Sequence, residues 1–190
     1  MATGQEQTAP DAVMTRIGQV VILHHAGDRE EARHRFLALW AEIGEHGDPL
    51  HRCTLAHYMA DTQDDPSDEL AWDLRALTAA EELTDERLAA HEGAWAEGAV
   101  GGEGGGLREG AVAVRALYPS LHLNLAADYV KLSRVGAART HLRRARESAE
   151  ALGDDPYGDG VRAAIRRLEL RLEDEGAAGD GGWGPPRQRP

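Results

Sequence analysis

The chain has 190 residues, enough for one domain with flexible ends, and its formal net charge is −12, from 21 basic and 33 acidic residues. This charge disfavours a surface that binds nucleic acid phosphates, and favours neutral or basic protein partners. The single cysteine, Cys53, permits neither an internal disulfide nor a cysteine metal cluster, so a reducing cytoplasm is expected. No secretory signal and no run of roughly 18 apolar residues is visible, so neither secretion nor a membrane partner is expected.

The composition favours an all-α protein. The apolar residues are largely Ala and Leu, with a single Phe, which suits close-packed helices more than a sheet. Basic residues are nearly all arginine and Gly is abundant, a pattern typical of GC-rich bacterial genomes.

The N-terminal part of the chain predicts a helical hairpin. Residues 1–10 are small and polar and are expected to be flexible. Asp11 is a suitable cap for a first helix, and a turn at residues 25–28 separates that helix from a second one. The apolar residues at helical spacing are Val13, Ile17, Val20 and Val21 in the first helix, and Ala32, Phe36 and Leu39 in the second.

A second hairpin is predicted after residue 48. Asp48-Pro49 and Asp65-Pro66 each combine a capping residue with a proline suited to the first helical turn. The predicted inner faces consist of Leu55, Ala56 and Met59 in the first helix, and of Leu70, Leu74 and Leu77 in the second. Trp40, Trp72 and Trp95 are interpreted as packing residues.

Glycine interrupts the middle of the chain. A short helix is predicted from Thr84 to about Trp95, and residues 97–107 are predicted to form a flexible Gly-rich loop. The loop contains neither a GxGxxG nor a GxxxxGK[ST] motif, so a phosphate site is not favoured. A helix is expected to resume at Leu107, with a kink or a new start at Pro119.

The clearest hairpin covers residues 124–151. Small Ala126 and Ala138 permit close approach of two helices joined by a turn at residues 132–136. The space beyond is filled by Tyr129 and Leu142. A final helix follows, with an apolar stripe of Val161, Ile165, Leu168 and Leu172, and residues 176–190 are predicted to be a disordered tail.

A constant offset relates the first and the last hairpin. Val20, Leu23, Ala32, Phe36 and Leu39 align with Ala126, Tyr129, Ala138, Leu142 and Ala145. This pattern of small and large residues resembles the tetratricopeptide (TPR) repeat. The resemblance implies a right-handed α-solenoid over residues 11–175, with about three helix-turn-helix repeats and a C-terminal capping helix.

Catalytic signatures are missing from the sequence. His91-Glu92 lacks the second histidine of a zinc-protease helix, and neither a GxSxG elbow nor an EF-hand loop is present. We therefore expect no enzymatic activity and no cofactor.

The TPR resemblance also implies where a partner binds, because the first helix of each repeat lines a concave groove. We predict a non-catalytic adaptor that holds a protein or peptide segment in this groove. The residues predicted to contact that partner are His24, His25, His57, Asp61, Asn124 and Lys131.

Three alternatives stay open at this point. The histidines, with Cys53 and Asp61, could instead hold a metal ion or a small molecule, with Asp61 orienting His57 from one helical turn away. The acidic turn at residues 61–69 could attract a cation or a basic peptide, although a solvated turn is favoured. The exposed faces of the first two hairpins could form a homodimer.

Overall fold

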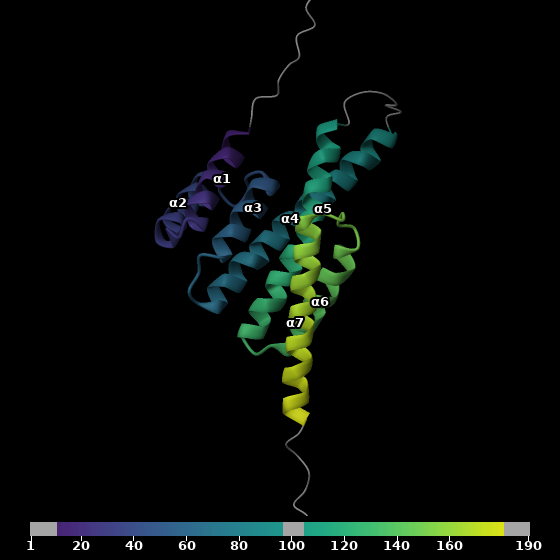
Figure 1. Cartoon of the computed structure of the whole chain (residues 1–190). Coiled ribbons are helices and arrows are strands. Elements are labelled where there is room, and N and C mark those ends of the chain that lie inside the picture. Colours follow the sequence, from purple (N-terminus) through teal and green to yellow (C-terminus); the bar gives the residue numbers. More distant parts are fainter. Residues whose placement is uncertain (1–10, 97–104, 181–190) are drawn as a thin grey trace, which may run out of the picture. The chain divides into compact units, whose positions relative to one another are not determined.

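The computed structural model describes residues 11–96 and 105–180, and its side chains are described for residues 11–83 and 117–174 (Figure 1). Within these ranges the chain is helical and no strand occurs, which confirms the all-α class. The helices are α1 (Ala12–His25), α2 (Arg29–Ile43), α3 (Pro49–Ala60), α4 (Pro66–Ala96), α5 (Gly105–Lys131), α6 (Val135–Ala149) and α7 (Pro156–Asp180).

The chain divides into two compact units, with the boundary between Leu83 and Thr84 inside α4. The sequence had predicted one domain over residues 11–175. The predicted flexible N-terminus at residues 1–10 lies outside the described residues. None of the helices in the described ranges combines the length and the apolar character that a membrane crossing requires.

Helix starts in the first unit follow the predicted caps. The Asp11 carboxylate accepts hydrogen bonds from the backbone N–H groups of Val13 and Met14, at 2.9 and 3.0 Å. Asp48 caps α3 in the same way, with N–H donors 2.9 and 3.1 Å away. These contacts satisfy backbone donors that have no partner within the helix.

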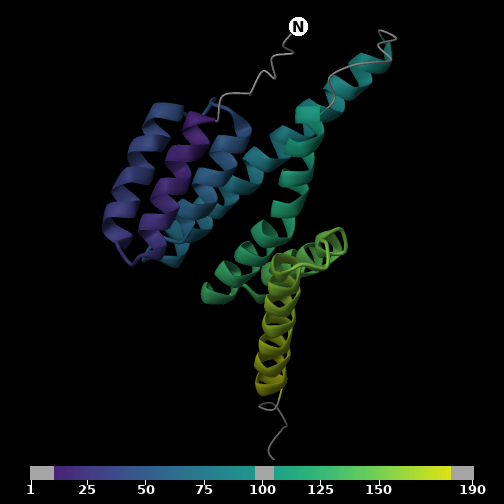
Figure 2. The same ribbon diagram turned by 45° about the horizontal axis from the view of Figure 1, so that its top comes forward.

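The core of the first unit lies between α1, α2 and α3, which pack side by side (Figure 2). Phe36 is completely buried there, and Trp40 meets Trp72 edge to face with ring centroids 5.0 Å apart. Both tryptophans therefore act in packing, as predicted. The buried apolar residues of this core are Ile17, Val20, Ala32, Phe36, Leu39, Leu55 and Met59.

Helix α4 differs from the prediction in two ways. It runs unbroken from Pro66 to Ala96, whereas a new helix was expected at Thr84. No glycine or proline occurs from Ser67 to Glu92, and buried Ala80 and Leu83 continue the inner stripe towards Thr84. The predicted inner residue Leu74 is 39% exposed, because buried Asp73 takes the inward position beside it.

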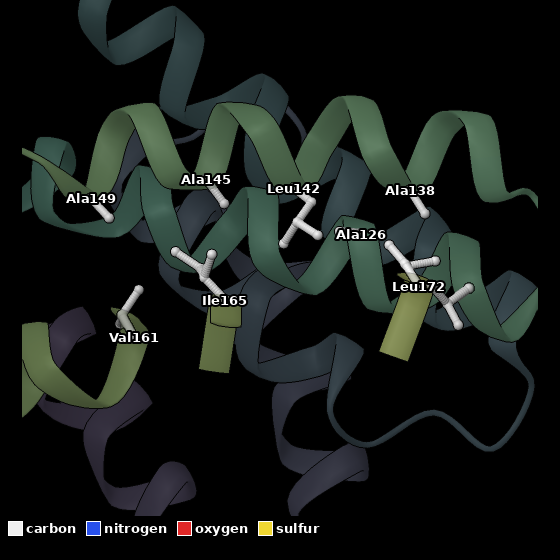
Figure 3. Close-up of a cluster of buried hydrophobic side chains, with 9 residues drawn as sticks. Ala126, Ala138, Leu142, Ala145, Ala149, Val161, Ile165 and Leu172 are labelled. Atoms are coloured by element: carbon white, nitrogen blue, oxygen red, sulfur yellow. The ribbon is translucent and has the colours of Figure 1, made fainter. Parts of the chain in front are cut away.

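The core of the second unit lies between α5, α6 and α7. Figure 3 shows the labelled side chains of α6 pointing towards those of α5 and α7. Small Ala126 and Ala138 are fully buried, as the close approach of α5 and α6 requires. The buried apolar set is Ala126, Val130, Ala138, Leu142, Ala145, Ala149, Val161, Ile165 and Leu172.

Helices α5 and α7 are longer than expected. Pro119 lies inside α5 and does not begin a new helix, because the burial of Leu121 and Leu125 outweighs the single hydrogen bond that a proline removes. Gly105 begins α5, so residues 105–107 of the predicted Gly-rich loop are helical, and residues 97–104 lie outside the described ranges. Helix α7 continues past Gly176 to Asp180, and the rest of the predicted tail is not described.

The turns of the two aligned hairpins share one hydrogen-bond pattern. Asp28 N–H donates to the Leu23 carbonyl at 3.3 Å, and Arg134 N–H donates to the Tyr129 carbonyl at 2.7 Å. These pairs are related by the offset that aligns the sequences. Gly27 and Ser133, at equivalent positions, both have positive φ, of 100° and 56°. The two hairpins are thus alike in backbone as well as in pattern.

Candidate functional site

The six residues predicted to bind a partner are distributed over both units. His24 and His25 end α1, and their rings lie 5.7 Å apart. His57 lies in the last turn of α3, and Asp61 caps its end. Asn124 and Lys131 belong to α5 of the second unit, where the Lys131 amine lies 3.3 Å from the Asp128 carboxylate. A single groove shared by all six residues stays a prediction.

His57 is paired with a carboxylate that the sequence did not indicate. Its Nδ1 lies 3.6 Å from Oδ1 of Asp73 on α4, while Asp61 contributes only a weaker attraction. Burial alone would lower the pKa of His57, but the Asp73 carboxylate, supported by Asp61, raises it above its usual value. Asp73 interrupts the apolar stripe between Leu70 and Leu77, and this polar residue at an inward position was the available signal.

Cys53 does not supply a thiolate to a groove. The side chain is completely buried, and burial together with the negative charge of Asp73 raises the pKa of the thiol to about 12. Among the side chains that the structure describes, no three His, Cys, Asp or Glu residues gather so that they could hold a metal ion.

The acidic turn between α3 and α4 makes contacts within its own unit. Asp64 lies 2.6 Å from Arg29 and 3.1 Å from Arg33, both on α2. The same arginines donate to the backbone carbonyls of Gln63 and Thr62. At Asp64 the turn therefore ties α2 to the α3–α4 connection instead of offering a free carboxylate.

A pair of histidines joins α5 to α6. Nδ1 of His122 lies 3.2 Å from Nδ1 of His141, and the His141 ring stacks on Tyr129 with centroids 5.4 Å apart. Burial, the neighbouring His141 and the positive charge of Arg144 lower the pKa of His122 to about 4. Neutral His122 and His141 can share one hydrogen bond, with one Nδ1 donating and the other accepting.

Two hollows lie on the described surface between α6 and α7, wholly within the second unit. One has a volume of about 210 Å³ and reaches Leu142 and Leu172, and the other has about 370 Å³ and reaches Ala149 and Ile165. Both are lined by Arg146 and Glu169, so the two hollows adjoin each other, and together they are called the α6–α7 groove here.

The sides of the α6–α7 groove are charged. Five arginines and three glutamates line it: Arg139, Arg143, Arg146, Arg162, Arg166, Glu150, Glu169 and Glu173. Arg143 and Arg146 are 68% and 73% exposed at their side chains. Arg162, by contrast, is held by Asp159 at 3.0 Å and by the Gly153 carbonyl. The groove therefore offers guanidinium groups above an apolar floor.

Sequence reasoning missed this groove because it treated the charged residues of α7 as the back of a capping helix. The signal was the grouping of basic residues. Residues 134–173 hold nine of the 21 basic residues and seven acidic ones, a net charge of +2, while the rest of the chain carries −14.

The repeated hairpins and the open groove define an all-α protein of helical-repeat character. Comparison with known proteins found no matching family model, no similar curated protein and no similar solved structure.

Proposed function

We propose that the protein is a non-catalytic helical-repeat module that binds a segment of another protein. The equivalence of the α1–α2 and α5–α6 turns supports a repeat architecture, and we extend this to a TPR-like solenoid. Repeat proteins of this kind use the grooves between their helices as extended binding surfaces. The cytoplasmic location expected from the single cysteine is part of the proposal.

The observation that carries the proposal is the α6–α7 groove. Its floor consists of apolar side chains of the second core, and its sides are long, exposed arginines that present both aliphatic stems and charges. Arginine is enriched at the energetically dominant positions of protein interfaces. An apolar floor with adaptable charged sides suits a peptide segment, because a peptide supplies both kinds of contact.

A metal-binding or small-molecule protein, the alternative from the sequence, gains no support from the described residues. They contain no group of three metal-ligating side chains. The two hollows, about 210 and 370 Å³, fall below or at the low end of the volumes typical of ligand pockets.

The test combines partner capture from the source cell with binding by purified proteins. Three baits are compared: the wild type, the Arg143→Glu/Arg166→Glu variant of the α6–α7 groove, and the His57→Ala/Asp61→Ala variant of the groove predicted from the sequence. Each captured protein is then purified and titrated calorimetrically. We expect a captured partner to bind the wild type with a dissociation constant below ~100 μM. The Arg143→Glu/Arg166→Glu variant should raise this constant at least tenfold.

Two other results would change the proposal. If only the His57→Ala/Asp61→Ala variant binds the partner more weakly, the partner binds in the groove predicted from the sequence. If no captured protein binds purified wild type below ~1 mM, the protein is not a binding module.

A further inference from the structure

The charges and dimensions of the α6–α7 groove define the kind of segment that it accepts. We infer that its occupant is an acidic amphipathic helix whose apolar side chains enter the two hollows and whose carboxylates face the arginines. This inference rests on the proposed binding function, and it identifies the class of partner.

The spacing of the floor residues sets the spacing of the apolar side chains in the occupant. Leu142 and Ala149 are seven residues apart on α6, and Ile165 and Leu172 are seven apart on α7. Seven residues are about 10.5 Å along a helix. A bound helix therefore reaches both hollows with apolar residues at positions i and i+7, and residues at i+3 or i+4 fall between them.

The arginines set the charge of the occupant. Arg139 and Arg166 form no ion pair with any side chain that the structure describes, and the Arg139 guanidinium donates a hydrogen bond to the Leu172 carbonyl at 3.5 Å. Arg143 has a long, exposed pairing, at 3.9 Å, with Glu147 of its own helix. Three cations are thus available along the groove. A carboxylate placed between two arginines gains charge-assisted hydrogen bonds, which are the stronger kind in proteins.

The glutamates of the groove discriminate among anions. Glu150, Glu169 and Glu173 lie among the arginines, so a polyphosphate or nucleic acid backbone would place its charges beside theirs. An acidic helix avoids this repulsion, because apolar or neutral residues can face the glutamates. The groove therefore favours an acidic protein segment, although the net charge of the chain suggested a neutral or basic partner.

The experiment is selection from a displayed library of random 16-residue peptides on the purified full chain, followed by titration of enriched peptides. The groove variant is Arg143→Glu/Arg166→Glu, and Arg143→Gln/Arg166→Gln is a milder second variant. Arg16→Glu/Arg35→Glu makes the same change in net charge at exposed sites of α1 and α2, and serves as the matched control. Circular dichroism checks that each variant is folded.

We expect enriched peptides with net negative charge and with leucine, isoleucine or phenylalanine at i and i+7. Both groove variants should weaken their binding at least tenfold, the control less than threefold, and added salt should weaken binding to the wild type.

Enriched peptides that are neutral or basic, or that bind the groove variants as well as the wild type, would overturn the inference and leave the binding function standing. A selection without any enriched peptide, together with the absence of a captured partner, would overturn both.

Discussion

Arg146 of α6 and Glu169 of α7 face each other across the α6–α7 groove, with 3.8 Å between Nη1 and Oε1. Both residues line both hollows, so their ion pair lies where the two hollows join. Arg146 is 73% exposed, and a pair in this setting contributes little to stability. We expect the pair to open when a carboxylate of the proposed acidic partner replaces Glu169.

Neutralising Glu169 is expected to strengthen the binding of acidic peptides. Glu169→Gln removes a negative charge that competes for Arg146, so affinity should rise about threefold, while Arg146→Gln should lower it by a similar factor. Unfolding free energy should change by less than ~1 kcal/mol in either variant. Titration of one acidic peptide with the wild type and with both variants measures the effect. If all three proteins bind the peptide with the same affinity, these two groove charges do not contact it.

The turn residues Gly27 and Ser133 offer a test of the repeat equivalence. Both have positive φ, a conformation that is unfavourable by roughly 1 kcal/mol for a residue with a Cβ atom and by almost nothing for glycine. Ser133→Gly should therefore stabilise the second unit by ~0.5–1 kcal/mol, and Gly27→Ala should destabilise the first by about the same amount. The space around Gly27 is open, so the alanine meets no steric clash.

Urea unfolding of both turn variants, with wild type beside them, measures these changes. Opposite signs are expected because the same backbone position is occupied by glycine in one hairpin and by serine in the other. Destabilisation by Ser133→Gly would mean that the Ser133 side chain contributes more than its backbone strain costs.

Phe36 is the largest side chain in the core of the first unit, and its removal should be costly. Phe36→Ala leaves a cavity among α1, α2 and α3 and should lower the unfolding free energy by ~3–5 kcal/mol. The neighbouring Leu37 is 44% exposed, so Leu37→Ala should change the unfolding free energy by less than ~1 kcal/mol. Thermal unfolding of the two variants measures the loss of stability in each. Equal losses would mean that Phe36 contributes no more to the core than the exposed Leu37.

The His57–Asp73 pair should stabilise the fold more at low pH than at high pH. The pKa of His57 is raised in the folded state, so protonated His57 contributes its full stabilisation below the unfolded value of about 6.5, and the contribution disappears as pH rises through the folded pKa. His57→Gln should therefore cost ~1–3 kcal/mol at pH 6 and less at pH 8.5. The measurement is urea unfolding at both pH values.

His34, an exposed histidine of α2, provides the control for this experiment. His34→Gln should show little change at either pH. A loss in His57→Gln that is the same at pH 6 and pH 8.5 would contradict the charge pairing with Asp73.

The His122–His141 pair should make the second unit sensitive to acid. Folded His122 accepts a proton only near pH 4, whereas the unfolded residue does so near 6.5, so acidification between these values favours unfolding. Between pH 7 and pH 5 the wild type should lose more stability than the His122→Gln variant, because the glutamine side chain at position 122 does not titrate. Melting temperatures at the two pH values measure this, and parallel losses in both proteins would exclude His122 as the sensitive group.

Local sequence predicted much of the secondary structure correctly. Asp11 and Asp48 occur where helices begin, because short acidic side chains reach the first N–H groups of a helix. Ala32 and Ala138 are buried where two helices approach closely, because only small residues fit there. These features depend on neighbours within a few residues, and such neighbours are visible in the sequence.

Longer elements were harder to predict from the sequence. Pro119 suggests a boundary by its own chemistry, yet α5 continues through it. The prediction allowed a kink or a new start at this position, and of these the new start does not occur, because packing over many residues outweighs a local preference of a few kcal/mol.

The sequence by itself determined the helical class, the caps and the equivalence of the two hairpins, since each depends on residue spacing along one or two helices. Only the tertiary structure decided that His57 is paired with Asp73 of α4 and that arginines of α6 and α7 line a common groove. The physical reason is that these relationships join residues on different helices. Their distances depend on how the helices pack, which the spacing of residues along one helix does not specify.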